Sequence, residues 1–275
     1  MLRQRALSAA VLVPPVLLAL VAGLPRIAAV VVLAVAVGAF ETFRLLRAAG
    51  YPTLPAFGTV LAVALVLGAA VRPKPETVAI LLAVGTILAA VGAFGRPDPR
   101  DGLVAWMATV FGALYVALLG FALLVAAAAP AVPADALLAP LGAERGWVLL
   151  LLVAVWSYDT GAYAFGRAFG RARFLSHISP SKTYAGLVGG LAASTAVVTL
   201  VLAGLGQPAW ARLLLGPALG LAAQAGDLAE SMLKRAAGAK DSGTLIPGHG
   251  GILDRTDSFL FAAPVLALYV LAVVR

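Results

Sequence analysis

The stretch LVAWMATVFGALYVALLGFALLVAAA, residues 103–128, contains no charged side chain. A helix needs about 20 apolar residues to cross the hydrocarbon core of a bilayer, so this stretch predicts a transmembrane helix. Similar apolar stretches recur on both sides of it, separated by charged residues, Pro and Gly. They cover residues 6–24, 27–43, 54–71, 77–94, 147–165, 183–205, 210–228 and 258–274.

The composition supports the same class of protein. Apolar residues make up 62% of the 275 positions and charged residues 12%, and the mean hydropathy is +1.02. A soluble domain carries roughly 25% charged residues, because water must wet its surface. We therefore predict an all-α, polytopic integral membrane protein with about nine transmembrane helices, eight and ten being the alternatives. The absence of Cys excludes disulfides, thiolate nucleophiles and cysteine-based zinc sites.

The distribution of charge predicts the orientation. If the N-terminus is cytoplasmic and the first stretch is a retained helix rather than a cleaved signal, most of the 20 Lys and Arg residues fall in cytoplasmic segments. The two longest polar loops, 166–182 and 234–257, then share the cytoplasmic side. Residues 1–150 are expected to be mainly a helical scaffold, and residues 151–275 the catalytic region. The basic residues are scattered between apolar runs, which argues against nucleic acid as a partner.

Polar residues first gather on one helical face. Gln224, Asp227, Ser231 and Lys234 are spaced by three, four and three residues, so they share a face of a helix that leaves an apolar run. The ordinary interpretation is a polar helix end with Asp227 paired to a nearby Arg. The functional interpretation is a substrate or metal site at the inner membrane boundary.

The next polar stretch is KDSGTLIPGHGGILDRTDS, residues 240–258. Gly residues let backbone N–H groups approach phosphate oxygens, and His249 lies among them with little to pack against. Asp254 and Asp257, three residues apart at the start of an apolar run, can ligate one hard cation, and Mg²⁺ usually accompanies nucleoside triphosphates. The alternative is a Gly-Pro turn in which the aspartates cap the last helix.

Two further groups lie around the loop 166–182. Asp159 stands late in an apolar run, where an ionisable residue indicates function or, alternatively, an ion pair with Arg167. Ser179-Pro180 precedes Lys182 and Thr183, which open the next apolar run. These two residues can hold a phosphate or serve as an ordinary helix cap and an interfacial lysine.

Together these residues resemble the phosphatidate cytidylyltransferase (CDP-diacylglycerol synthase) family. Its signature has the form S-x-x-K-R-x4-K-D-x-G-x2-[LIF]-P-G-H-G-G-x-x-D-R-x-D, which this chain reads from Ser231 to Asp257. The family's usual S-P-K-K-T-x-E-G has Ser181 and Ala185 here in place of its first Lys and its Glu. The detailed resemblance covers about 100 residues.

The resemblance implies transfer of a cytidylyl group from CTP to phosphatidic acid, giving CDP-diacylglycerol and pyrophosphate. It implies catalytic roles for Asp227, Lys234, Asp254 and Asp257, with Mg²⁺, or alternatively Mn²⁺, on the three aspartates. The implied substrate-binding residues are Asp159, Tyr163, Arg167, Ser179, Lys182, Thr183, Ser231, Arg235, Lys240, Asp241, His249, Gly250, Gly251 and Arg255.

The expected location is a bacterial inner membrane with the site on the cytoplasmic face, where soluble CTP meets membrane lipid; a homodimer is left open. Two alternatives remain. One is a CTP-dependent kinase or cytidylyltransferase for another membrane lipid, because the motif indicates nucleotide and metal rather than acyl chains. The other is a transporter using Asp159, Asp227 and Glu41 as intramembrane ion sites.

Overall fold

The structure, a computed structural model, describes residues 13–71, 75–246 and 250–273. Helices dominate this part of the chain, and its β pairings are two isolated bridges, Arg173–Thr183 and Ile246–Gly250. The α-helices are α2 (Leu24–Ala48), α3 (Pro55–Val71), α4 (Pro75–Ala93), α5 (Pro99–Ala117), α6 (Phe121–Ala127), α7 (Ala143–Phe169), α8 (Tyr184–Gly204), α9 (Ala209–Ala236) and α10 (Leu253–Val273), with 3₁₀ turns η1 (Leu118–Gly120) and η2 (Ala139–Leu141).

The observed helices follow the predicted apolar stretches. Within the described residues, six are long and apolar enough to cross a membrane, the longest combining α5, η1 and α6 over Pro99–Ala127. The segment Val13–Ala22 and most of α3 are shorter apolar helices. The predicted class, an all-α polytopic membrane protein, is confirmed. The largest departure is α9, which continues to Ala236 and so carries the polar face beyond the predicted end at 228.

The chain divides into two compact units. Unit 1 comprises residues 1–124 and 232–256, and unit 2 comprises residues 125–231 and 257–275. The segment 232–256, which holds most of the Gly-rich signature, therefore groups with the N-terminal helices. The predicted functional division at residue 150 stays a prediction.

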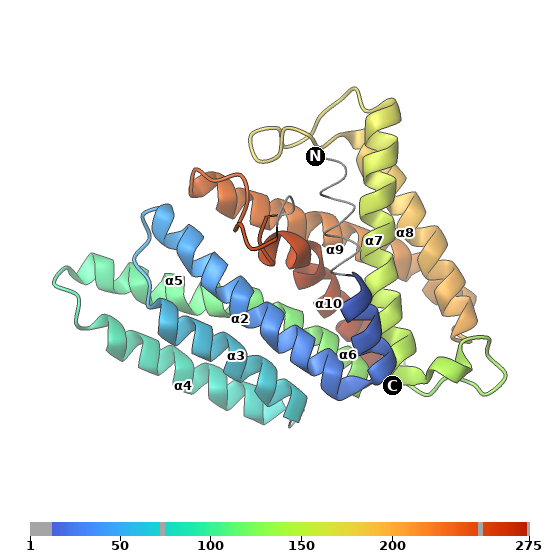
Figure 1. Ribbon diagram of the computed structural model, residues 1–275, viewed down its shortest axis with the longest axis horizontal. Helices are drawn as coiled ribbons and strands as arrows, with labels where there is room; N and C mark the ends of the chain where they lie inside the picture. Colours follow the sequence, from blue (N-terminus) through green and yellow to red (C-terminus); the bar gives the residue numbers. More distant parts are fainter. Residues whose placement is uncertain (1–12, 72–74, 247–249, 274–275) are drawn as a thin grey trace. The chain divides into compact units, whose positions relative to one another are not determined.

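In unit 1, helices α2 to α5 lie side by side (Figure 1). Phe43 of α2 is fully buried, and glycines on both neighbours make room for its ring. A Cβ added at Gly58 of α3 would lie 2.2 Å from the ring, and one at Gly112 of α5 would lie 2.7 Å from it. A large aromatic side chain set into glycine gaps fixes how these helices approach one another.

In unit 2, α7 and α8 pack along their lengths (Figure 1). Their backbones come close at Gly161, where an added Cβ would lie 2.6 Å from the carbonyl oxygen of Gly189. Gly190 leaves space for the buried Tyr158 ring, which a Cβ would approach to 2.7 Å. Small residues at such crossings are typical of helix pairs in lipid. This packing fixes the end of α7 beside the start of α8.

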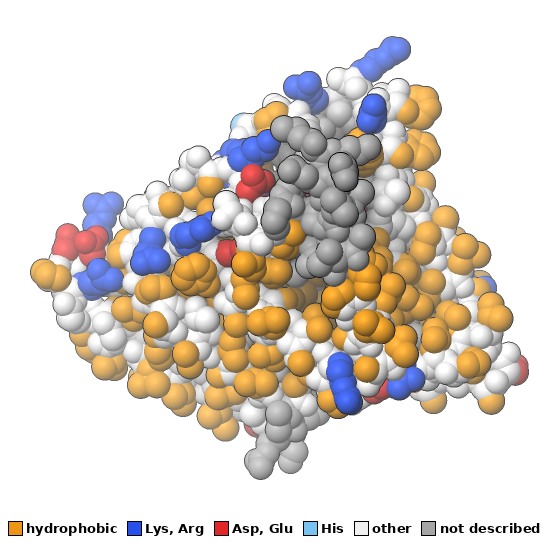
Figure 2. Space-filling view, viewed as in Figure 1, with side chains coloured by type: hydrophobic (Ala, Val, Ile, Leu, Met, Phe, Trp, Pro, Cys, Tyr) orange, Lys and Arg blue, Asp and Glu red, His pale blue; other side chains and the backbone are white. Residues whose placement is uncertain are grey.

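Charged and apolar side chains separate along the helices of unit 1. Large hydrophobic side chains remain exposed on the helix flanks, among them Leu33 (66% exposed) on α2, Val60 on α3 and Ile80 on α4. Figure 2 shows hydrophobic side chains spread over these flanks, with Lys and Arg toward the helix ends. Lipid is the solvent that such flanks require.

Candidate functional site

A pocket of about 400 Å³ opens in unit 2 at the end of α7. Five of the side chains predicted to bind substrate line it, coming from α7, the loop after it and the start of α8: Asp159, Tyr163, Arg167, Lys182 and Thr183. Ser181 and Gln224 also contribute. The pocket thus gathers residues from three sequence segments around two cationic side chains.

Local folding places Lys182 and Thr183 at the pocket. Thr183 is the N-cap of α8, and its hydroxyl accepts a hydrogen bond from the Gly186 N–H at 3.1 Å. At Gly170, where α7 ends, an added Cβ would lie 2.1 Å from the Gly166 carbonyl oxygen. The chain can therefore turn tightly and run back toward α8. The uncompensated N–H groups and positive end of a helix favour an anion at this position.

Asp227 is held by partners within unit 2. Lys182 forms an ion pair with its carboxylate, and both side chains are about one-fifth exposed. The Ser231 hydroxyl donates to the other carboxylate oxygen at 3.4 Å. The predicted alternative of an Asp227–Arg pair is thus replaced by a lysine from the loop between α7 and α8. The ion pair connects the aspartate on α9 with the pocket.

Gln224 lines the pocket, although the sequence analysis placed it only on the polar face and not among the substrate-binding residues. It is 5% exposed, and its Oε1 accepts a hydrogen bond from the Tyr158 hydroxyl at 2.8 Å. Its Nε2 has no hydrogen-bond partner among the residues that the structure describes. The available signal was its place three residues before Asp227 on the predicted polar face.

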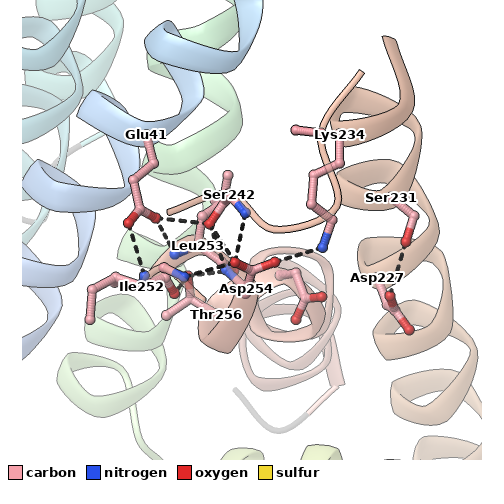
Figure 3. A network of polar contacts seen from close by, with 12 residues as sticks. Glu41, Asp227, Ser231, Lys234, Ser242, Ile252, Leu253, Asp254 and Thr256 are labelled. Atoms are coloured by element: carbon pink, nitrogen blue, oxygen red, sulfur yellow. Dashed lines mark hydrogen bonds and ion pairs between the residues drawn. The ribbon is translucent and has the colours of Figure 1, made fainter. Parts of the chain in front are cut away.

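In unit 1, Ser242 and Gly251 of the Gly-rich segment (residues 240–252, of which the structure describes 240–246 and 250–252) bind the carboxylate of Asp254 (Figure 3). Oδ2 of Asp254 accepts from Ser242 N at 2.7 Å, Ser242 Oγ at 2.8 Å and Gly251 N at 2.8 Å. Oδ1 accepts from Lys234 Nζ at 2.7 Å, and the Asp254 side chain is 5% exposed. A buried carboxylate with donors on both oxygens is strongly held, so Asp254 fixes the loop to α9.

Glu41 of α2 forms the other side of this network (Figure 3). It is 3% exposed and accepts from Ser242 Oγ at 3.0 Å, Ile252 N at 3.2 Å and Leu253 N at 2.8 Å. Arg44, one turn later on α2, donates to the Ser242 carbonyl oxygen. Sequence reasoning considered Glu41 only as an ion site of the transporter alternative and did not assign a role to Ser242.

The carboxylates give a physical reason for the glycines of the signature. A Cβ at Gly251 would lie 2.3 Å from Glu41 Oε1, and one at Gly243 would lie 2.4 Å from the same atom. Gly250, at φ +78°, would place a Cβ 2.4 Å from Asp254 Oδ2. The sequence interpretation assigned this glycine-rich segment to phosphate approach; the structure shows that these three also admit two buried carboxylates.

The remaining predicted site residues take different positions. Ser179 is buried, outside the pocket lining, and its carbonyl oxygen accepts from Lys182 N at 3.3 Å. His249 lies outside the residues that the structure describes. Exposed side chains on or beside the Gly-rich segment are Arg235, Lys240, Asp241 and Arg255. Their expected contacts with substrate stay predictions.

The predicted metal set is divided between the units, Asp254 in unit 1 and Asp227 and Asp257 in unit 2. Neither unit, over its described residues, contains a group of three His, Asp or Glu side chains able to hold one metal ion. Asp227 and Asp257 lie in the same unit, and Mg²⁺ commonly takes only one or two carboxylates and completes its shell with water and substrate phosphates, so a magnesium ion on this pair stays a prediction. The backbones meet beside them, a Cβ at Gly226 lying 2.3 Å from the Asp257 carbonyl oxygen.

Comparison with known proteins places the chain in a family. The family model described as "Cytidylyltransferase family" matches residues 3–273. The chain belongs to this family. Stretches of it are 49% identical over 124 residues to the phosphatidate cytidylyltransferase of Synechocystis, and 43% over 129 residues to that of Staphylococcus saprophyticus. It is also 46% identical over 123 residues to the phosphatidate cytidylyltransferase of Brucella suis.

These alignments cover part of each protein. They include 44%, 46% and 44% of this chain, and 42%, 50% and 46% of the respective relatives. The chain thus spans about half the length of the curated relatives it matches. The resemblance seen in the signature is confirmed at the level of the family.

Proposed function

We propose that this cytidylyltransferase-family protein transfers a cytidylyl group from CTP to phosphatidic acid in a bacterial inner membrane, with its site on the cytoplasmic face. The observation that carries the proposal is the pocket in unit 2, where five expected substrate-binding side chains meet and Lys182 reaches Asp227. Similarity to proteins named phosphatidate cytidylyltransferase supports this choice of substrates.

The reaction requires a phosphate oxygen of the lipid to attack the α-phosphorus of CTP. The new P–O bond forms as the bond to the β-phosphate oxygen breaks, and pyrophosphate carries away the electron pair. The attacking oxygen is already anionic near neutral pH, so no strong general base is required. The main obstacle is repulsion between two anions, which positioning and positive charge reduce.

The residues of the chain supply that charge and positioning. Arg167 and Lys182, beside the N-terminus of α8, form an anion site for a substrate phosphate. Arg167 is oriented by a hydrogen bond of 3.0 Å to the Tyr163 hydroxyl. In unit 1, the Gly-rich segment is proposed to bind the triphosphate, with Lys240 and Arg255 exposed on either side of it.

Asp227 and Asp257 are the proposed holders of Mg²⁺, with Mn²⁺ as the alternative. When bound, the divalent ion would neutralise charge on the phosphates and on the departing pyrophosphate. The sequence-based assignment of Asp254 to the same ion is retained as a prediction, although four donor groups lie within hydrogen-bond distance of its oxygens in unit 1.

A product assay tests the proposal. Purified protein in detergent, given CTP, phosphatidate and Mg²⁺, should form CDP-diacylglycerol and pyrophosphate, and EDTA should stop the reaction until Mg²⁺ is restored. Phospholipid plus CDP would instead indicate a CTP-dependent lipid kinase. Product formed only with other lipids would assign a different lipid substrate. Substrate flux in liposomes without nucleotide would support a transporter.

A further inference from the structure

The start of α10 is capped by a side chain from a distant part of the sequence. The first N–H groups of a helix lack partners within it and require acceptors from elsewhere. Here Ile252 N and Leu253 N donate to the carboxylate of Glu41, at 3.2 and 2.8 Å. Asp254 N lies 3.3 Å from Ser242 Oγ, and Arg255 N donates to the Ile252 carbonyl oxygen at 3.0 Å. Glu41 therefore accepts hydrogen bonds from two of the first four N–H groups of α10. It also lies within hydrogen-bond distance of the Ser242 hydroxyl, which is the acceptor of the third.

The same carboxylate is tied to the loop that precedes α10. Ser242 Oγ lies 3.0 Å from Glu41 Oε2 and 2.8 Å from Asp254 Oδ2. A hydroxyl has one hydrogen, so at any moment Ser242 donates to only one of these two carboxylates. Its position between them, with its backbone N–H on Asp254 at 2.7 Å, fixes residue 242 to the first turn of α10.

Nearby positive charges allow the carboxylates of Glu41 and Asp254 to be buried close together. Arg44 donates to the Ser242 carbonyl oxygen, and Lys234 pairs with Asp254 at 2.7 Å. The cluster therefore joins two carboxylates with two cations, and its members come from α2, α9, the loop and α10. A buried carboxylate with full hydrogen bonding and nearby cations is stable, whereas removal of one member leaves the others unpaired.

We infer that Glu41 is a positioning residue, whose carboxylate holds the Gly-rich segment and the start of α10 in the conformation that binds the nucleotide. α2 lies in the N-terminal region that the sequence assigned to scaffold. Glu41 acts through Ser242 and α10, so its effect should fall on the substrate that the Gly-rich segment binds. This last step rests on the proposed function, in which that substrate is CTP.

The kinetic test compares Glu41→Gln with the wild type and with Glu76→Gln, an exposed glutamate of α4 in the same unit. Gln keeps the size of the side chain but turns one acceptor into a donor facing backbone N–H groups. We expect KM for CTP to rise about tenfold or more and KM for phosphatidate to stay within about twofold, as for a misplaced binding loop. Glu76→Gln should have the same KM values for CTP and phosphatidate as the wild type. A fall in Vmax with both KM values unchanged would indicate a merely structural role and overturn the inference.

Hydrogen exchange gives a test that needs no activity. In Glu41→Ala the amides of Ile252 and Leu253 both lose their acceptor, and in Glu41→Gln at least one of them does, because only one side-chain oxygen remains. Each amide that loses its acceptor should exchange at least about tenfold faster, while α4 amides keep their rates. Unchanged exchange at both amides would overturn the inference. If Glu41→Ala does not fold, the isosteric Gln variant decides. If the wild type makes no CDP-lipid, the proposed function fails, and the exchange result still decides whether Glu41 holds the loop.

Discussion

Gly251→Ala is the sharpest test of how the signature loop is built. A Cβ at this position would lie 2.3 Å from Glu41 Oε1, 2.4 Å from Oε2 and 2.3 Å from Ser242 Oγ. No single side chain can move to relieve all three contacts. Gly251 N also donates to Asp254 at 2.8 Å, a bond that any backbone shift would stretch. The backbone of Gly251 is not left-handed, so the cost of alanine comes from packing alone.

The expected loss of stability in Gly251→Ala follows from these contacts. Overpacking a filled site costs about 1–3 kcal/mol. Loss of a hydrogen bond to a buried carboxylate adds roughly 1.5–3 kcal/mol. We therefore expect Gly251→Ala to destabilise the protein by about 4 kcal/mol, which lowers the unfolding midpoint by roughly 10 °C. Thermal unfolding in detergent, followed by tryptophan fluorescence, measures this shift.

A double-variant cycle identifies the cause. Glu41→Ala removes two of the three atoms that the new methyl group would strike, so Gly251→Ala should cost less in that background by at least about 1 kcal/mol. Gly95→Ala is the matched control, because a Cβ there meets nothing within 4 Å, and it should change stability by less than about 0.5 kcal/mol. Additive losses in the cycle, or a midpoint for Gly251→Ala equal to that of Gly95→Ala, would refute the packing argument.

Three further predictions concern unit 2. Lys182→Met should destabilise by about 1–2 kcal/mol, because it leaves the carboxylate of Asp227 without its cation at a site about one-fifth exposed, and should lower product formation at least tenfold. Tyr158→Phe should cost about 1–2 kcal/mol in thermal unfolding, because it removes the buried donor to Gln224. Gly161→Val should cost at least about 3 kcal/mol, because the α7 and α8 backbones could no longer meet.

Control variants distinguish these specific losses of stability and activity from general destabilisation of the protein. Tyr163 is 63% exposed, so the stability of Tyr163→Phe should stay within about 0.5 kcal/mol of the wild type. Equal effects of the two tyrosine changes would contradict the role given to the Tyr158–Gln224 bond. Lys182→Arg retains the charge and should keep more activity than Lys182→Met. An equal loss of activity in both variants would contradict the role given to the Lys182–Asp227 ion pair.

The fold could be predicted because lipid imposes one simple requirement on each helix. An apolar stretch must reach about 20 residues, and charges must lie at its ends, so hydropathy alone located the helices to within a few residues in most cases. The apolar stretch predicted for α9 ended at 228, because the last two turns of the helix are more polar. Helical spacing on its polar face was the better guide, because it continued to Lys234.

Site residues that are close together in the sequence could be predicted, whereas contacts between distant parts of the sequence could not. Four residues of α7 and of the α8 start were selected from polar positions beside apolar runs, and Tyr163 was added by the family resemblance. The structure brings all five to one pocket. The Glu41–Ser242 bond joins residues 201 positions apart, and no periodicity in either segment indicates the other. The Lys182–Asp227 pair likewise depends on how α8 and α9 pack.

The position of Glu41 changes what the Gly-rich signature means physically. A motif of glycines and aspartates is usually interpreted as a phosphate cradle, and that interpretation predicts that each glycine faces the ligand. Here Gly243 and Gly251 face Glu41 and Gly250 faces Asp254, so at least one reason for each of these three glycines lies inside the protein. The carboxylates draw the loop tightly around themselves, and only residues without a Cβ allow such an approach. In the function proposed above, a loop held in this way would lose less conformational entropy on binding a triphosphate, so an acid on α2 would contribute to catalysis without touching the substrate.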